Sequence, residues 1–140
     1  MRDSSYPEVI VNPVEEARRY VKNAKDLLQE KGRLNTEYQY YEDRKYVKMA
    51  GNTLWNGILL VLDAVFHVAN NKTSRPKFAD YKQAVAPRDQ KLLALIMMGY
   101  DQMHLSMGYD GNPSKANCQD AIRLANDIID RCAKMLPAAS

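Results

Sequence analysis

The sequence predicts an all-α protein, folded as an antiparallel up-and-down four-helix bundle with an extra short helix before the third main helix. Three observations support this prediction. Apolar residues recur at spacings of three and four in four long segments. No segment shows convincing alternation of apolar and polar residues, so a sheet is not expected. Short or moderate connections between four helices make this bundle the expected arrangement.

Length and composition indicate one domain, residues 1–140, with its core between residues 13 and 136. A chain of 140 residues with 46% hydrophobic and 26% charged residues is typical of a single globular domain. Asn56, Asp63 and His67 interrupt the richest apolar run, so no transmembrane span is expected. The N-terminus lacks the long apolar core of a signal peptide, and a cytoplasmic protein is therefore expected.

The first helix is predicted over residues 13–31. Asn12 is a good N-cap, Pro13 suits the first helical position, and Gly32 is expected to end the helix as its C′ residue. Residues 33–45 are rich in tyrosine and less regular. We expect a short helical turn or a bend there, with Thr36 as its cap, before a long helix from about Asp43 to Asn70.

The long helix is the centre of the predicted fold, because 12 of the 16 residues from Leu54 to Ala69 are apolar. One of its faces carries a polar stripe made of Asn52, Asn56, Asp63, His67 and Asn70. Another carries additional apolar residues, namely Trp55, Leu59, Leu62 and Phe66. A helix with apolar residues on two sides suggests a second subunit, and a homodimer is therefore expected.

The second half of the chain is predicted to hold three further helices. A short one covers residues 77–86, and a longer one runs from Pro87 or Arg88 to about Met107. The last begins at Asn112-Pro113 and stops at Pro137. Its apolar seam contains Cys118 and Cys132, which lie ~21 Å apart along a helix, too far for a disulfide. Both are interpreted as reduced core residues.

Charge gives little support for nucleic-acid binding. The net charge is +3, and a local basic patch accounts for it. The patch contains Lys72, Arg75, Lys77, Lys82, Arg88 and Lys91. A dedicated nucleic-acid binder usually has a stronger basic stripe.

Two constellations are candidates for chemistry. The spacings of Asp63 with His67 and of Asp101 with His104 place each pair on one helical face, where four such ligands could hold a divalent metal. The alternative, which we prefer, is that each aspartate caps a helix or pairs with its own histidine, so no metal and no cofactor are expected. The second constellation is a set of binding candidates near the end of the third main helix: Tyr100, Asp101, His104, Tyr109 and Asp110. Such residues line a ligand groove or are half-buried and hydrogen-bonded at a helix end.

Four segments together resemble the HEPN superfamily of small bacterial four-helix domains. They are the capped first helix, KYVKMAGNTLWNGILLVLDAVF, GYDQMHLSMGYDG and AIRLANDIIDRCAKML. The start of the second helix, DRKYVKMAG, is more closely similar to a group of uncharacterised bacterial proteins. The resemblance covers residues 14–136.

The resemblance implies a homodimer that acts as a ribonuclease or as a nucleotide-binding partner of a nucleotidyltransferase. The ribonuclease motif is an arginine four to six residues before a histidine on the third main helix. His104 takes the position of the histidine, but Met97, Met98 and Gly99 stand where the arginine is expected. Without a nearby guanidinium, nothing obvious stabilises charge on a scissile phosphate.

The sequence therefore predicts a non-catalytic module that binds a partner, a nucleotide or RNA, with no membrane association. The alternative is a ribonuclease that uses His104 without the usual arginine. Nucleotide binding is expected to depend on Tyr100 or Tyr109.

Overall fold

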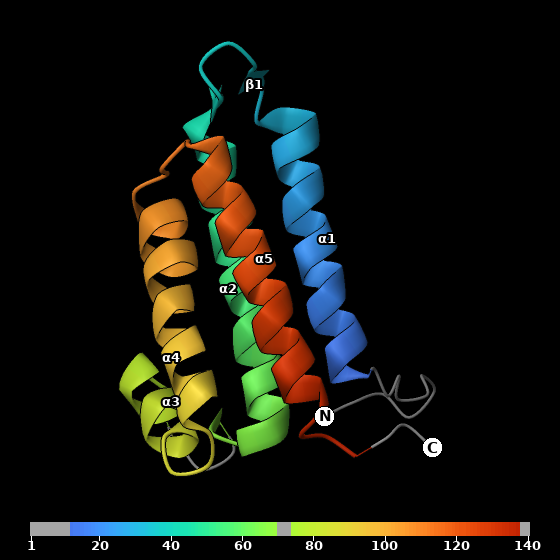
Figure 1. Cartoon of the computed structure of the whole chain (residues 1–140), viewed down its shortest axis with the longest axis vertical. Helices are drawn as coiled ribbons and strands as arrows, with labels where there is room; N and C mark the ends of the chain where they lie inside the picture. Colours follow the sequence, from blue (N-terminus) through green and yellow to red (C-terminus); the bar gives the residue numbers. More distant parts are fainter. Residues whose placement is uncertain (1–11, 70–73, 138–140) are drawn as a thin grey trace.

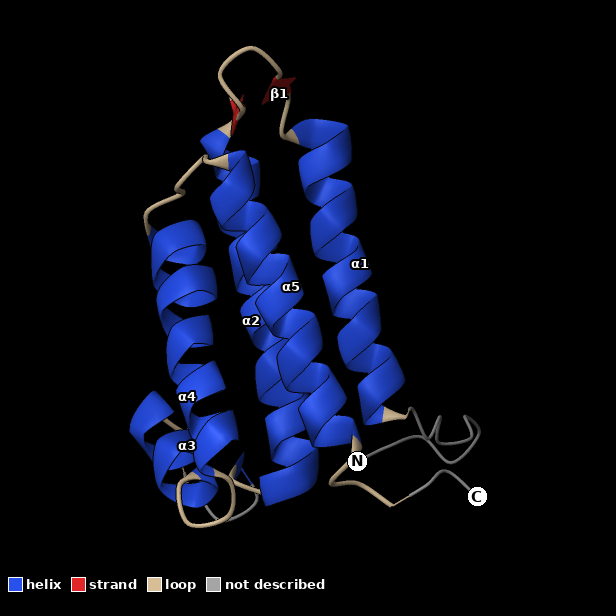
Figure 2. Ribbon diagram, viewed as in Figure 1, coloured by secondary structure: helices blue, strands red, loops and turns tan. Residues whose placement is uncertain are grey.

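The computed structural model describes residues 12–69 and 74–137, and it confirms the all-α class (Figure 1). Figure 2 shows that helices make up most of these residues. The elements in chain order are α1 (Pro13–Lys31), β1 (Leu34–Asn35), β2 (Tyr40–Tyr41), α2 (Arg44–Phe66), α3 (Phe78–Val85), α4 (Gln90–Gly99), η2 (Tyr100–Tyr109) and α5 (Lys115–Ala133).

Four long helical segments lie side by side, and α2 is at their centre. Figure 1 shows that α1, α2, the continuous α4–η2 segment and α5 run in alternating directions, with α3 beside the lower end of α4. Helix α2 packs against α1, α3, η2 and α5. The long helix identified from its composition is therefore the element around which the others assemble.

The apolar seams of the terminal helices face this centre. In α1 the buried residues are Ala17, Val21, Ala24 and Leu28. In α5 they include Cys118, Ala121, Ala125, Ile128 and Cys132, all fully inaccessible. Burial raises the pKa of the Cys118 thiol to about 11 and that of Cys132 to about 12. Both cysteines are free thiols, as predicted.

The additional apolar side of α2 is largely covered within the chain. Leu62 is fully buried and Trp55 is only 5% exposed. Trp55 contacts Phe78 of α3 and Tyr100 of η2. At Trp55, the surface that suggested a second subunit is therefore occupied by α3 and η2, and Leu59 and Phe66 are half-buried, so most of this surface is not free for the expected homodimer.

By length and composition alone, α2 is also a candidate to cross a membrane, although its polar residues led us to expect no transmembrane span. Half of its most apolar 18-residue window is buried inside the protein. A helix at the centre of a folded core meets the same two criteria.

The first helix begins and ends where predicted, but Gly32 does not have the predicted role. The Asn12 side chain accepts hydrogen bonds from the amides of Val14 and Glu15 at 2.9 and 3.3 Å. Gly32 itself is right-handed, with φ −70°, and Arg33 takes the left-handed conformation with φ 56°. Glycine fits position 32 because a Cβ there would lie 2.7 Å from Cδ1 of Tyr41.

Residues 33–42 form a β-hairpin, and the prediction of a helical turn capped by Thr36 is wrong. Strands β1 and β2 pair antiparallel, Leu34 with Tyr41 and Asn35 with Tyr40 (Figure 2). At the tip, the Asn35 side chain accepts hydrogen bonds from the amides of Glu37 and Tyr38 at 3.1 and 2.9 Å. The hairpin also bonds to the segment before α5, where the amide of Tyr41 donates to the carbonyl of Pro113 at 2.9 Å.

The central helix is shorter than predicted. It begins at Arg44 with Asp43 as its N-cap and ends at Phe66, because His67 is left-handed, with φ 54°. Helix α3 lies within one residue of its predicted bounds. Asn70 of the polar stripe and Lys72 of the basic patch lie outside the described residues.

The predicted starts of the last two long helices are also corrected. The N-cap of α4 is Asp89, whose side chain accepts from the amide of Leu92 at 3.0 Å. The N-cap of α5 is Ser114, two residues after Asn112, and its hydroxyl accepts from the amide of Asn117 at 3.2 Å. Arg131 of α5 donates two hydrogen bonds to Asp89, at 2.8 and 3.0 Å, and thereby ties the two helices together.

The third long helix changes type in the middle, which its sequence did not predict. Residues 100–109 form a π-helix, η2, as in the hydrogen bond from the amide of Asp110 to the carbonyl of Leu105 at 2.9 Å. Hydrogen bonds between residues five apart give a wider helix than the α form, and such segments often occur at functional sites.

Candidate functional site

A cleft of about 460 Å³ lies between α2, α3 and η2. Its lining combines ring faces, side-chain amides and one guanidinium. The lining residues are Asn52, Trp55, Asn56, Leu59, Arg75, Pro76, Phe78, Tyr81, Tyr100 and His104. This volume is within the range of small-molecule sites, about 300–1,000 Å³.

Four rings form one connected cluster in the wall of this cleft. Phe78 and Tyr100 are stacked, with centroids 4.2 Å apart and planes 2° from parallel. Trp55 meets the edges of both, at 5.6 and 5.7 Å. The imidazole of His104 lies 5.1 Å from the Tyr100 ring and 6.2 Å from Trp55. The cluster joins α2, α3 and η2, and it fixes the shape of the cleft.

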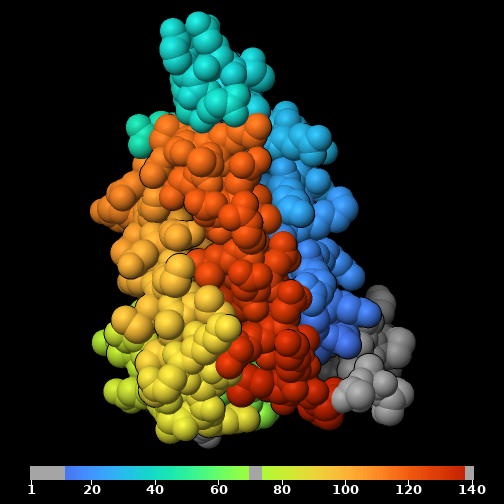
Figure 3. Space-filling view, in the orientation of Figure 1, coloured from blue at the N-terminus to red at the C-terminus, as the bar shows by residue number. Residues whose placement is uncertain are grey.

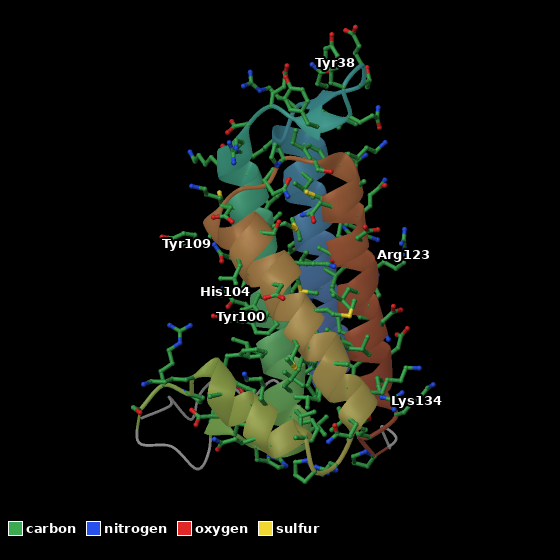
Figure 4. The ribbon with its side chains drawn as sticks, turned by 60° about the vertical axis from the view of Figure 1, so that its left-hand side comes forward. Tyr38, Tyr100, His104, Tyr109, Arg123 and Lys134 are labelled. Atoms are coloured by element: carbon green, nitrogen blue, oxygen red, sulfur yellow. The ribbon has the colours of Figure 1, made fainter. Side chains whose placement is uncertain are left out.

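The π-helix places Tyr100 and His104 together. More than four residues complete each turn of a π-helix, so side chains four or five apart lie on one side. Figure 4 shows Tyr100, His104 and Tyr109 one above another on the same side of the molecule, facing away from Arg123 of α5. The cleft includes the first two, whereas Tyr109 lies beyond it and is 77% exposed.

Two glycines hold η2 close to α2. A Cβ at Gly51 would lie 2.6 Å from the amide nitrogen of Gly108, and a Cβ at Gly108 would lie 2.5 Å from Oδ1 of Asn52. The Asn52 side chain donates to the carbonyl of Gly108 at 3.4 Å. Close backbone packing therefore sets the position of Asn52 relative to His104.

The polar groups of the cleft come from two places in the chain. Asn52 and Asn56 lie four residues apart on the exposed side of α2 and supply amide donors and acceptors. Arg75 and Pro76 come from the segment just before α3. A guanidinium binds carboxylate or phosphate groups, so the cleft combines a flat apolar wall with a site for an anion.

A second hollow, also about 460 Å³, adjoins the cleft further along α2. The two share Asn56, Leu59, Arg75, Pro76 and Tyr81, and Asp63 lines the second hollow. The Asp63 carboxylate accepts from the Tyr81 hydroxyl and from the amide of Ala69, both at 3.1 Å. Burial and the neighbouring Asp63 raise the pKa of Tyr81 to about 12, so this hydroxyl stays protonated and donates at neutral pH.

The possible metal site is not formed. No group of three or more histidine, cysteine, aspartate or glutamate side chains within residues 12–69 and 74–137 could hold a metal ion. Asp63 caps the end of α2 and binds Tyr81, whereas His67 is the exposed left-handed residue that follows α2. His104 packs on Tyr100 in the cleft, and Asp101 is exposed.

The structure divides the five binding candidates into two groups. Tyr100 and His104 line the cleft. Asp110 lines a different hollow, with Arg44, Lys45, Lys48 and Met49. The Arg44 guanidinium donates to the carbonyls of Asp110 and Gly111 at 2.8 and 2.9 Å. Asp101, Tyr109 and Asp110 are therefore not part of the cleft.

Sequence reasoning missed several residues of the cleft. Arg75 was counted only as part of the basic patch, and Phe78 was not singled out. Arg88, another arginine of the basic patch, lies over the Phe66 ring at 4.8 Å. The polar stripe did indicate Asn52 and Asn56, but no pattern in the sequence shows that the residues before α3 fold over them.

Comparisons with known proteins identify relatives but no activity. A family model described as Domain of unknown function (DUF5618) matches residues 12–134. A solved structure of a protein of unknown function from Dyadobacter fermentans is similar, with 37% sequence identity and a TM-score of 0.79. The match covers 89% of this chain and 96% of that one. A comparison with curated proteins gave no match.

Proposed function

The chain belongs to the family described as Domain of unknown function (DUF5618), and we propose that it is a non-catalytic module that binds a nucleotide or a nucleotide unit of RNA. The observation that supports this is the composition of the cleft. It holds ring faces, two side-chain amides and a guanidinium within one hollow. A nucleotide has the matching parts: a flat base, a hydrogen-bonding base edge and a phosphate.

The base would lie against the ring cluster. Phe78 and Tyr100 already stack on each other, so a ligand uses the surfaces that they, Trp55 and His104 leave toward the cleft. Stacking of a base on an aromatic side chain contributes about 1–3 kcal/mol. The amides of Asn52 and Asn56 can donate to and accept from a base edge.

The phosphate would lie at Arg75. A guanidinium donates paired hydrogen bonds to phosphate oxygens. A hydrogen bond to a charged group contributes about 1.5–3 kcal/mol, which corresponds to roughly tenfold or more in affinity. This arrangement makes the phosphate contact separable from the base contact.

Titration calorimetry with adenosine monophosphate and adenosine tests both contacts. We expect the monophosphate to bind more tightly, and Arg75→Gln to remove that advantage while adenosine binding stays unchanged. Tyr100→Leu should weaken both ligands, because it removes a ring from the cleft wall. Tyr109→Ser is the matched control, since Tyr109 lies outside the cleft. Absence of binding by either ligand at millimolar concentration would refute the proposal.

One observation favours a ribonuclease as the second candidate. Arg75 lines the same cleft as His104, so a guanidinium is present near the histidine although the sequence motif lacks it. His104 could then act as the acid or base, and Arg75 could stabilise charge on the phosphate. Incubation with single-stranded and structured RNA separates the candidates. Cleavage that is lost in His104→Ala and in Arg75→Gln would favour the enzyme.

The remaining parts of the proposal concern the fold, the cellular location and the partner. The alternating α1, α2, α4–η2 and α5 segments support an antiparallel four-helix bundle of HEPN-like type with α3 as the extra helix (Figure 1). A cytoplasmic location and a nucleotidyltransferase partner stay predictions. Co-purification with a nucleotidyltransferase would support the second of these.

A further inference from the structure

We propose that two copies of the chain associate through the tip of the β-hairpin, with Tyr38 of each copy inserted into a groove between α1 and α5 of the other. This contact is independent of the cleft and of its ligand. It involves two features that the proposed function does not use: a projecting aromatic side chain and an apolar hollow at the same end of the molecule.

Tyr38 is presented to solvent on a rigid support. The hairpin projects beyond the ends of the helices (Figure 3), and Tyr38 lies at its outer end (Figure 4). Its side chain is 70% exposed. The tip is fixed by the Asn35 side chain, which accepts from the amide of Tyr38 at 2.9 Å, and by the bond from the Gln39 amide to the Asn35 carbonyl at 2.8 Å.

The base of the hairpin is anchored to the body of the protein. The amide of Lys115 donates to the carbonyl of Gln39 at 3.1 Å, and Tyr40 forms a β-bridge with Ser114. A backbone held this way loses little conformational freedom on binding, and tyrosine is among the residues that contribute most at protein interfaces.

The groove lies just below the hairpin, where α1 meets α5. It has a volume of about 480 Å³ and an apolar floor. The lining residues are Lys25, Leu28, Gln29, Leu34, Tyr41, Gln119 and Ile122. Leu28 is 2% exposed and forms part of the floor, whereas Lys25, Gln29 and Gln119 are exposed residues of the rim. Polar residues around an apolar floor are typical of a protein-binding pocket.

Charge favours a second copy as the occupant. Glu37 precedes Tyr38 at the tip, and Lys25 lies on the rim of the groove. Both are exposed, and neither makes an ion pair with another described residue. Insertion of Tyr38 into the groove of the other copy would bring Glu37 close to Lys25.

Geometry supports a reciprocal contact. The groove is lined by residues from the end of α1, the hairpin and the start of α5, so it lies at the same end of the molecule as the tip. A two-fold axis near that end can place each tip over the groove of the other copy. Such an interface contains two tyrosines and two Glu37–Lys25 pairs. One substitution therefore changes both halves of the dimer.

Sedimentation velocity of the full chain from about 1 to 200 μM tests the proposal. We expect a concentration-dependent dimer. Removal of a central aromatic anchor weakens the affinity of an interface about tenfold or more. The symmetric dimer loses this contact twice, so Tyr38→Ser should weaken its affinity about 100-fold. Tyr109→Ser is the matched control and should leave the dimer intact, because Tyr109 is 77% exposed on a different element.

Charge exchange makes the contact specific. Glu37→Lys and Lys25→Glu should each weaken the dimer, and the double variant should restore it. Lys25, Glu37 and Tyr38 are all exposed, so thermal unfolding of each variant should match that of the natural chain. A monomer at every concentration, or a dimer that Tyr38→Ser leaves unchanged, would overturn the proposal. Loss of the dimer in Tyr109→Ser instead would also overturn it, because the contact would then lie elsewhere.

Discussion

Replacement of Gly51 by alanine tests how closely η2 packs on the central helix. A Cβ at Gly51 would lie 2.5 Å from Cβ of Met107 and 2.6 Å from both the amide nitrogen of Gly108 and the carbonyl oxygen of Met103. Carbon atoms in contact normally lie about 3.5–4.0 Å apart. Two of the three atoms belong to the backbone and cannot rotate aside. We therefore expect η2 to move away from α2.

The size of the effect follows from two opposing contributions. Overpacking a core costs about 1–3 kcal/mol, and the backbone contacts place Gly51→Ala at the upper end. Alanine regains about 1 kcal/mol of helix propensity over glycine. The free energy of unfolding should therefore fall by about 2 kcal/mol. With an unfolding entropy of about 2.1 cal/mol/K per residue, the melting temperature of this 140-residue chain should fall by about 7 °C.

Gly99→Ala, at the end of α4, is the matched control. Its Cβ would lie 3.2 Å from Cδ1 of Ile128, the end of a flexible side chain, and 3.5 Å, an ordinary contact distance, from Cε of Met103 and Cζ3 of Trp55. We expect its free energy of unfolding to stay within about 1 kcal/mol of the natural chain. Thermal and urea unfolding followed by circular dichroism measure both variants. Unchanged stability in Gly51→Ala, or equal losses in the two variants, would refute the reasoning.

Three further predictions follow from features of the fold. Burial raises the pKa of Cys118 to about 11 and of Cys132 to about 12, so iodoacetamide at pH 8 should label both only after unfolding; rapid labelling of the folded protein would contradict this. The hydrogen bond from Arg131 lowers the pKa of Asp89 in the folded protein. The ionised Asp89 therefore stabilises the fold above its unfolded-state pKa of about 3.9, and this stabilisation is lost as pH falls through the lower folded-state pKa. Urea unfolding from pH 6 down to pH 2 should show this loss in the natural chain and a flatter profile in Asp89→Asn, and identical profiles would exclude it. Arg33→Gly should raise the free energy of unfolding, measured in urea, by about 0.5–1 kcal/mol. The left-handed conformation costs an L-residue about 1–2 kcal/mol, and glycine does not have this cost. The greater entropy of glycine in the unfolded state cancels about half of the gain. A less stable variant would show that the Arg33 side chain makes a compensating contact.

The parts of the fold that the sequence predicts are those set by local chemistry. Asn12 followed by Pro13 marks the start of α1, because a side-chain acceptor and a fixed φ act within one turn. The buried seams of α1 and α5 follow from apolar spacing alone. These signals lie within a few residues of the structure that they specify, and no tertiary contact is needed to interpret them.

The parts that failed depend on contacts between distant segments. The hairpin has only two residues in each strand, too few to show alternation, and it is held by Pro113 and Ser114 far along the chain. The apolar residues along the third long helix are spaced as in an α-helix, so their spacing did not distinguish an α-helix from the π-helix that forms. The π-helix packs closely on α2 at Gly51 and Gly108, and this contact between distant segments is not visible in the spacing.

The candidate site shows the same division. The sequence indicated Tyr100 and His104 as members of a cluster of candidates near the end of one helix. Arg75 was not, because its place in the cleft depends on how the segment before α3 folds over α2. Asp63 was expected to cap a helix or pair with His67, with a metal site as the alternative. The structure gives it a cap at the end of α2 and a partner, Tyr81, that is 18 positions away in sequence.

The π-helix also bears on how the length of this protein can change during evolution. A π-helical turn holds more residues than an α-helical turn, so removal of one residue within Tyr100–Tyr109 can be absorbed by a return to α-helical hydrogen bonding. In a helix without such a segment, each residue turns the chain by about 100°, and a deletion would turn everything on one side by that angle. Relatives should therefore lose a residue in η2 more readily than in α2, and the spacing of Tyr100, His104 and Gly108 should differ in those that have done so.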